Sequence, residues 1–164
     1  MKIKFGELMI ETLLLTSAWI IFTVALIIFV PRNRIREAWV IYLFKQIITW
    51  LLGLAVVELR LIEYPIRLFA YANKTSFSFE YFIYPAICVI FNLHYPVGKS
   101  SIKQLLYYIV YCSAITIIEV FCEKYTDIIN YTGWTWYYTW LSLFATFYLT
   151  RMFYLWFFKT KNKG

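Results

Sequence analysis

The sequence has few of the residues on which most enzyme active sites depend. Its 164 residues include one aspartate, Asp127, one histidine, His94, and three cysteines, none of them in a Cys-x-x-Cys pair. These absences exclude an aspartate-rich metal–diphosphate motif, a two-aspartate protease and a multi-histidine metal site, and they weigh against a thiol oxidoreductase. The chain also has only five glycines, no phosphate-binding loop and no Gly-x-Ser-x-Gly elbow to accompany His94.

The chain also has few charged residues, and this low proportion indicates the class of protein. Charged residues make up 15% of the chain, against 62% hydrophobic and 23% aromatic residues. A soluble domain is about a quarter charged, and a disordered chain needs few aromatics, so the composition excludes both and predicts a multi-pass membrane protein. The net charge of +7 is spread between apolar runs instead of forming a dense basic surface. We therefore expect no nucleic-acid partner.

Five apolar runs are long enough to be considered as membrane-spanning helices, which need about 20 residues. The third is the shortest and contains Pro85, and the fifth is followed by a basic tail at 159–164. We predict an all-α bundle forming a single domain over residues 1–158, with spans at about 12–30, 38–57, 77–93, 105–121 and 136–158.

The segment 59–73 between the second and third runs is too polar to span a bilayer. Its apolar residues at 59, 62, 66 and 69 recur at helical spacing, and Glu63 and Arg67 are adjacent on a helix as i and i+4. This pattern predicts an amphipathic helix lying in the membrane interface. The alternative is an irregular loop, because Pro65 must start, bend or break a helix.

The distribution of basic residues predicts the orientation. With five spans, the side that carries the C-terminal tail holds eight lysines and arginines, and the opposite side holds six. Basic residues favour the cytoplasmic side, so we expect the N-terminus outside and the C-terminus inside.

Two basic residues fall within the predicted spans, where a charge is costly. Lys45 and Arg151 each lie about two turns from a cytoplasmic end. We expect Lys45 to extend its ammonium to the interface. Arg151 has two readings, the same snorkelling or a buried contact with carbonyls or a phosphate.

Acidic residues gather at the predicted outer end. Glu58, Glu80 and Glu119 lie near the outer ends of spans, and Glu63 lies in the adjacent segment, where Arg67 is a counter-ion. Trp134 and Trp136 belong to an aromatic run at the same level. Salt bridges that fasten the interfacial helix are one interpretation, and a site for a cation, amine or lipid headgroup is the other. The candidate ligand-binding residues are Glu58, Glu63, Arg67, Glu119, Trp134, Trp136 and Arg151.

Several motifs from about Arg60 onward resemble one family. They are Glu63-Tyr64-Pro65-x-Arg67, Tyr84-Pro85 to Tyr95-Pro96, and Glu119 through Tyr125-Thr126, Tyr131 and Trp134-x-Trp136 to Arg151. The chain is similar to a family of small uncharacterised multi-spanning membrane proteins of spore-forming Gram-positive bacteria. The resemblance implies a bacterial cytoplasmic membrane and a similar bundle, and it transfers no catalytic residue.

The sequence thus favours a non-enzymatic membrane protein with an acidic and aromatic cluster that binds a small cation, a lipid headgroup or a partner protein. One alternative is a small oligomeric transporter or channel subunit. Another is a lipid-modifying enzyme, for which His94, Glu119 and tyrosines are the only candidates. We expect no cofactor or metal, and we expect contacts with membrane lipids and with a second copy or a partner membrane protein.

Overall fold

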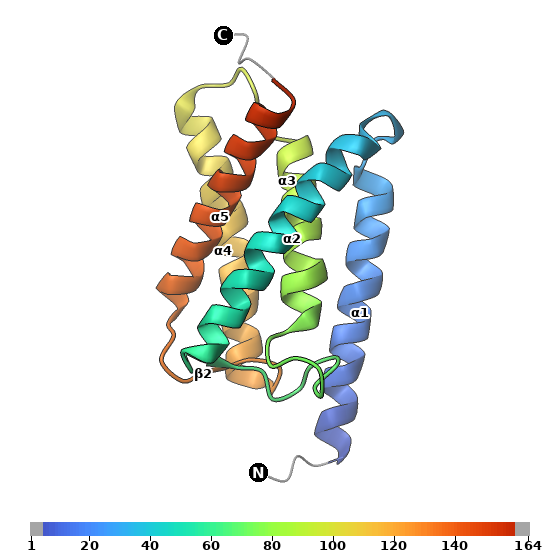
Figure 1. The fold of residues 1–164 in the computed structure, drawn as a ribbon, viewed down its shortest axis with the longest axis vertical. Coiled ribbons are helices and arrows are strands. Elements are labelled where there is room, and N and C mark those ends of the chain that lie inside the picture. The colour runs from blue at the N-terminus through green and yellow to red at the C-terminus, as the bar shows by residue number, and fades with distance from the viewer. Residues whose placement is uncertain (1–4, 160–164) are drawn as a thin grey trace.

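The chain forms a bundle of antiparallel helices, shown in Figure 1 from blue to red along the sequence. The computed structural model describes residues 5–159, and the predicted basic tail from 160 onward lies outside the described residues. The main helices are α1 Phe5–Phe29, α2 Ile35–Glu58, α3 Tyr84–Leu93, α4 Ser101–Tyr125 and α5 Trp136–Phe157. A 3₁₀ turn, η1 (Arg32–Arg34), precedes α2, and a π-helix, η2 (Phe77–Ile83), leads directly into α3.

Successive helices run in opposite directions, so each end of the bundle collects alternate connections (Figure 1). At one end, β1 (Ile62–Glu63) and β2 (Asn130–Tyr131) pair antiparallel, with Ile62 opposite Tyr131. We call this the sheet end. The other end carries η1 and the α3–α4 connection, and it is named the arginine end for Arg34, which binds there to Glu37 and to the α3 carbonyl of Leu93.

Three helical stretches are long and apolar enough to cross a membrane by length and composition: Met9–Phe29, Arg32–Glu58 and Ser101–Tyr125. They contain the predicted spans at 12–30, 38–57 and 105–121, apart from Val30, which follows the end of α1. The predicted span at 77–93 is a shorter apolar helix made of η2 and α3. The predicted span at 136–158 corresponds to α5, which is 22 residues long and is not one of these three stretches.

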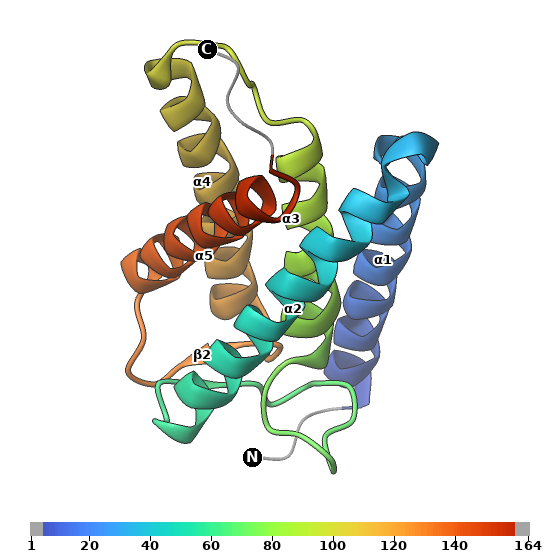
Figure 2. The same cartoon turned by 45° about the horizontal axis from the view of Figure 1, so that its top comes forward.

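Helix α3 is the buried centre of the bundle, which explains why so short a helix is so apolar. Eight of its ten residues are buried, and its Cys88 and Phe91 share a core with Ile41 of α2, Cys112 of α4 and Phe147 of α5. Helix α1 lies at one edge, as Figures 1 and 2 show.

Helix α1 is attached through the sheet end and through η2 and α3. Glu11 is buried, and its Oε1 accepts a hydrogen bond from the backbone N–H of Asp127. One turn along, Leu15 packs against Ile66 and Ile128. Long stretches of α1 expose leucine and isoleucine side chains, as a helix facing lipid does.

The predicted interfacial helix at 59–73 is wrong. The segment contains β1 and a series of turns, and Ile62, Tyr64 and Ile66 are buried while Glu63 and Pro65 between them are exposed. This is the two-residue alternation of an extended chain, not the spacing of a helix. Arg60 and Phe69 have φ values of 55° and 56°, which a right-handed helix does not allow.

Candidate functional site

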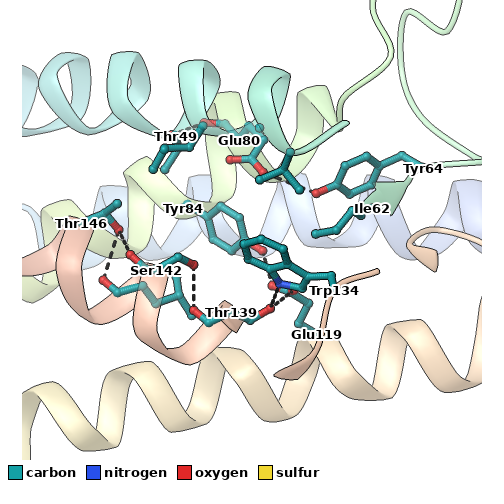
Figure 3. A pocket seen from close by; sticks show the side chains of 14 residues that line it. Thr49, Ile62, Tyr64, Glu80, Tyr84, Glu119, Trp134, Thr139, Ser142 and Thr146 are labelled. Carbon is teal, nitrogen blue, oxygen red and sulfur yellow. Dashed lines mark hydrogen bonds between the residues drawn. The ribbon is translucent and has the colours of Figure 1, made fainter. Parts of the chain in front are cut away.

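A cavity of about 100 Å³ lies inside the sheet-end half of the bundle, between α2, η2, α4 and α5. Its walls carry two carboxylates from different elements, and Figure 3 shows both with the side chains around them. We call it the carboxylate cavity. Its polar lining residues are Thr49, Tyr64, Glu80, Tyr84, Glu119, Trp134, Thr139, Ser142 and Thr146.

Glu119 of α4 is held by three hydroxyl groups. Tyr84 donates to its Oε2 at 2.6 Å, and Tyr131 and Thr139 donate to its Oε1 at 2.6 and 2.7 Å. Trp134 Nε1 donates to Thr139 Oγ1 at 2.8 Å and so completes the network (Figure 3). A carboxylate accepts hydrogen bonds and donates none, so three donors suit an ionised Glu119.

Glu80 of η2 points into the same cavity with far less support (Figure 3). Its nearest donor is Tyr64, whose hydroxyl lies 3.5 Å from Oε1, a long and weak hydrogen bond. Its Oε2 has no hydrogen-bond partner within the described part of the chain. Both carboxylate residues are 8% exposed, so the difference between them lies in their donors and not in their burial.

Pro85 explains why a π-helix carries Glu80. Proline has no N–H, so the hydrogen bond that position 85 of a regular helix would give to the carbonyl of Tyr81 is missing. Two side chains of α2 take its place, because Tyr42 Oη and Gln46 Nε2 each donate to that carbonyl at 2.9 Å. The carbonyl of Glu80 likewise accepts from Thr49 Oγ1 at 2.7 Å. The wide turn is therefore fastened to α2 and turns the Glu80 side chain toward the cavity.

Gly53 makes room for that side chain. A Cβ at this position would lie 2.8 Å from Thr75 Oγ1 and 2.9 Å from Glu80 Cγ, closer than real side chains approach. Position 53 follows Lys45 and Thr49 at four-residue intervals, so the three share one face of α2. The absence of a side chain at 53 allows η2 to pack closely against α2.

Lys45 is completely buried near the middle of α2, so the prediction that it reaches the interface is wrong. Its Nζ donates to Thr146 Oγ1 at 2.5 Å and lies 4.4 Å from the centre of the Phe147 ring. Thr146 also lines the carboxylate cavity, which places the ammonium just beyond the cavity wall. The inward face of α2 decides this outcome, because a lysine on that face has no path to the interface.

The structure brings only two of the seven predicted site residues, Glu119 and Trp134, into the cavity. Glu58 and Glu63 are exposed, and with Arg67 they line a separate surface groove of about 480 Å³. The predicted ion pair between Glu63 and Arg67 does not form. Arg67 donates instead to the carbonyls of Tyr64, Asn73 and Ala70, and so holds the loop together.

The other two predicted residues lie away from the cavity. Trp136 begins α5 and is 60% exposed. Arg151 is buried toward the arginine end, where Nη1 donates to the carbonyl of Asn92 at 3.4 Å and the guanidinium stacks on the Tyr95 ring. This is the buried contact that the sequence left open for Arg151.

Sequence reasoning missed most of the cavity lining, and one signal could have found it. Lys45, Thr49 and Gly53 form a stripe on α2, and Thr139, Thr146 and Thr150 form a stripe on α5. Small and polar residues at these spacings within apolar helices are typical of faces that pack against other helices in a membrane. A search for such stripes would have shown that both helices turn polar faces inward.

Two tyrosines outside the predicted spans, Tyr64 and Tyr131, act as hydrogen-bond donors to the carboxylates of the cavity. Burial raises the pKa of Tyr64 well above its usual value, and the neighbouring Glu80 adds to the effect. Burial and the charge of Glu119 likewise raise the pKa of Tyr131. Both phenols therefore stay protonated at physiological pH and act as donors.

The oxygen atoms that line the cavity are hard ligands from carboxylates and hydroxyls. Within residues 5–159, no three His, Cys, Asp or Glu side chains gather as a metal-binding cluster requires. His94 is the C-cap residue of α3 at the arginine end, whereas Glu119 lies in the last turns of α4, which runs from the arginine end to the sheet end. Of the residues considered for lipid chemistry, His94 and Glu119 therefore do not share a site, whereas Tyr84 and Tyr131 contact Glu119.

Comparison with family models, with curated proteins and with solved structures finds no match for this chain. Its function has to be inferred from the chemistry of the cavity. That chemistry consists of two buried carboxylates, a ring of hydroxyls, three aromatic side chains and one nearby ammonium group.

Proposed function

We propose that this chain is a non-enzymatic, multi-pass membrane protein that binds a small monovalent cation in the carboxylate cavity. The observation that carries the proposal is Glu80, a carboxyl group 8% exposed, facing a cavity with one oxygen unpartnered in the described part of the chain. A buried carboxylate without partners is costly, and a cation beside it removes much of that cost.

The charges around the cavity favour a single positive charge. Glu80 and Glu119 contribute two negative charges when both are ionised, and Lys45 contributes one positive charge behind Thr146. One monovalent cation makes this set neutral. A divalent cation would leave an excess positive charge inside the bundle, which the low-dielectric surroundings oppose.

The size and the walls of the cavity favour an alkali or a small ammonium ion. About 100 Å³ is room for a small ion together with a few water molecules. Carboxylate and hydroxyl oxygens suit alkali cations, and they accept hydrogen bonds from an ammonium group. The faces of Tyr64, Tyr84 and Trp134 add the cation–π attraction that aromatic rings offer.

A small oligomeric transporter or channel subunit is the second candidate. Buried polar side chains continue from the cavity toward the arginine end, in the order Lys45, Thr146, Thr150, Asn92 and Arg151. Such a line across a bundle is expected of a pathway, although five helices alone leave little room for one.

We further propose five spans in a bacterial cytoplasmic membrane, with the N-terminus outside. The alternating directions of the helices, the positive-inside charge distribution and the resemblance to membrane proteins of spore-forming bacteria support this arrangement. It places the sheet end and the mouth of the cavity at the outer surface.

Cysteine labelling in intact cells tests this topology. In a chain whose native cysteines are replaced, Lys74→Cys and Lys99→Cys put exposed thiols on the loops before and after η2 and α3. A membrane-impermeant maleimide should label position 74 and leave position 99 unlabelled until the cells are opened. Equal labelling of both would show that η2 and α3 do not cross, and the reverse pattern would invert the orientation.

Calorimetric titration of the detergent-purified protein tests cation binding. NaCl, KCl and methylammonium chloride are titrated separately, with N-methylglucamine chloride as a cation too large for the cavity. At least one small cation should bind with a stoichiometry of one, and Gly53→Ala should weaken that binding by about tenfold or more because its Cβ displaces Glu80. Ala55→Val adds bulk to an exposed position of the same helix and should bind as wild type does. No binding of any small cation would refute the proposal.

A further inference from the structure

The two carboxyl groups of the cavity differ in a way that assigns them different roles. Glu119 accepts three hydrogen bonds of 2.6 to 2.7 Å, so its negative charge is stabilised by the protein itself. Among the described residues Glu80 has a single donor, at 3.5 Å, so its negative charge is poorly stabilised. When two neighbouring carboxyl groups have such unequal surroundings, the less supported group is the one that holds a proton.

The charged and titratable groups that face Glu80 agree with this assignment. They come from four elements around it: Lys45 from α2, Tyr64 after β1, Tyr84 from α3 and Glu119 from α4. Lys45 and Glu119 are opposite charges and together are neutral. The cavity is therefore neutral when Glu80 is protonated and negative when it is not, and a neutral set is favoured inside a membrane.

We infer that a cation enters the carboxylate cavity in exchange for the proton of Glu80. The inference rests on the proposed cation binding and adds its coupling to a proton. In the exchange, the O–H bond of the Glu80 carboxyl group breaks and its electron pair stays on the oxygen. The proton leaves to water, the cation takes its place beside the carboxylate, and the charge of the cavity does not change.

A second buried group, the hydroxyl of Thr75, lies where it can donate a hydrogen bond to Glu80 once Glu80 has lost its proton. Thr75 is completely buried, and its Oγ1 has no partner within the described residues. Thr75 Oγ1 and Glu80 Cδ both lie within 3.0 Å of the position that a Cβ of residue 53 would occupy. An unpaired hydroxyl beside a carboxyl group is free to donate to it once the carboxyl proton has gone.

The test measures proton release and cation affinity on the full chain in mild detergent. Titrations with the cation that binds best, among Na⁺, K⁺ and methylammonium, are run in two buffers of different ionisation enthalpy, and the difference in heat counts the protons released. Wild type should release about one proton per cation at low pH. Its affinity should rise about tenfold for each pH unit until Glu80 is ionised without the cation.

Two variants locate the proton. Glu80→Gln has the same shape and no proton to lose, so its residual binding should release none and should not depend on pH. Tyr64→Phe removes the one donor to Glu80, and the pH-dependent range should move upward because the carboxylate is then harder to form.

The outcomes separate this inference from the proposed function. Cation binding without proton release in wild type overturns the exchange and leaves cation binding in place. A proton still released by Glu80→Gln assigns the exchange to another group and also overturns the inference. Failure of every small cation to bind, at any pH, overturns both.

Discussion

Replacing Lys45 with methionine should destabilise the cation-free bundle and tighten cation binding about 30-fold at low pH. The Lys45 ammonium is fully buried, donates to the Thr146 hydroxyl and lies 4.4 Å from the centre of the Phe147 ring. Its removal leaves the buried negative charge of Glu119 without a counter-charge, and the loss of one partner from a set of buried charges costs about 3–5 kcal/mol. The Lys45 ammonium repels a cation in the cavity by about 2 kcal/mol, at an effective dielectric constant near 20, and that energy corresponds to the 30-fold gain.

Thermal unfolding in detergent and calorimetric titration at fixed pH measure the two effects of this substitution. Lys103→Met makes the same change at an exposed position of α4 and should alter neither quantity. Binding in Lys45→Met should also depend less on pH, because a cation can then enter without the loss of a proton. Weaker binding after Lys45→Met would mean that the ammonium holds the cavity open or contacts an anion, and would contradict the charge balance proposed above.

Glu119→Gln should destabilise the protein by about 3 kcal/mol and abolish measurable cation binding. Hydrogen bonds to a charged acceptor contribute about 1 kcal/mol more than bonds to a neutral one, and Glu119 accepts three of them. A loss of this size lowers the unfolding midpoint of a chain of this length by roughly 6–12 °C. Binding is lost because Lys45 is then the only charge beside the cavity when Glu80 is protonated.

Differential scanning of the unfolding midpoint, followed by titration at a temperature where the variant is folded, separates these two effects. Glu58→Gln provides the matched control, because Glu58 is an exposed carboxylate at the end of α2 and should tolerate the change in both assays. A Glu119→Gln variant with normal stability and normal affinity would show that the charge of Glu119 contributes neither to stability nor to cation binding. It would also move the candidate cation site to Glu80 alone.

The helices were predictable because their signal is the absence of charge. The runs at 12–30, 38–57 and 105–121 are so apolar that they form helices whatever they pack against, and the structure confirms these helices. The stretch at 77–93 was harder to interpret, since Pro85 produces a π-helix that depends on Tyr42 and Gln46 of another helix. The sequence around Pro85 cannot show that side chains of another helix supply the missing hydrogen bonds.

The sequence predicted how far along the bundle the site residues lie, but it did not predict which face of each helix carries them. Glu58 and Glu119 both lie near the sheet end, as their positions in the sequence predict, yet one faces outward and the other is buried. With apolar residues on every side of these helices, the pattern that normally marks the inner face is absent. For the same reason the sequence did not show that Lys45 faces the core.

The loop at 59–73 shows a different limit. Its apolar residues fit both a helical and an extended spacing, and the choice depends on Asn130 and Tyr131, which pair with β1 from nearly seventy residues away in the sequence. Local pattern alone could not reveal that partner. The irregular-loop alternative was closer to the observed structure than the helix.

The attachment of α1 has a consequence for the order in which this protein assembles. Glu11 is buried and bonded to the backbone of Asp127, which lies 116 residues later in the chain, and Leu15 packs against Ile128. At typical rates of synthesis, on the order of ten seconds separate the appearance of the two ends of that contact. The first helix made must therefore wait with an unpaired carboxyl group until the last connection between helices, the one from α4 to α5, has emerged. We expect it to be the last helix to dock, and the one whose placement is most sensitive to interruptions late in translation.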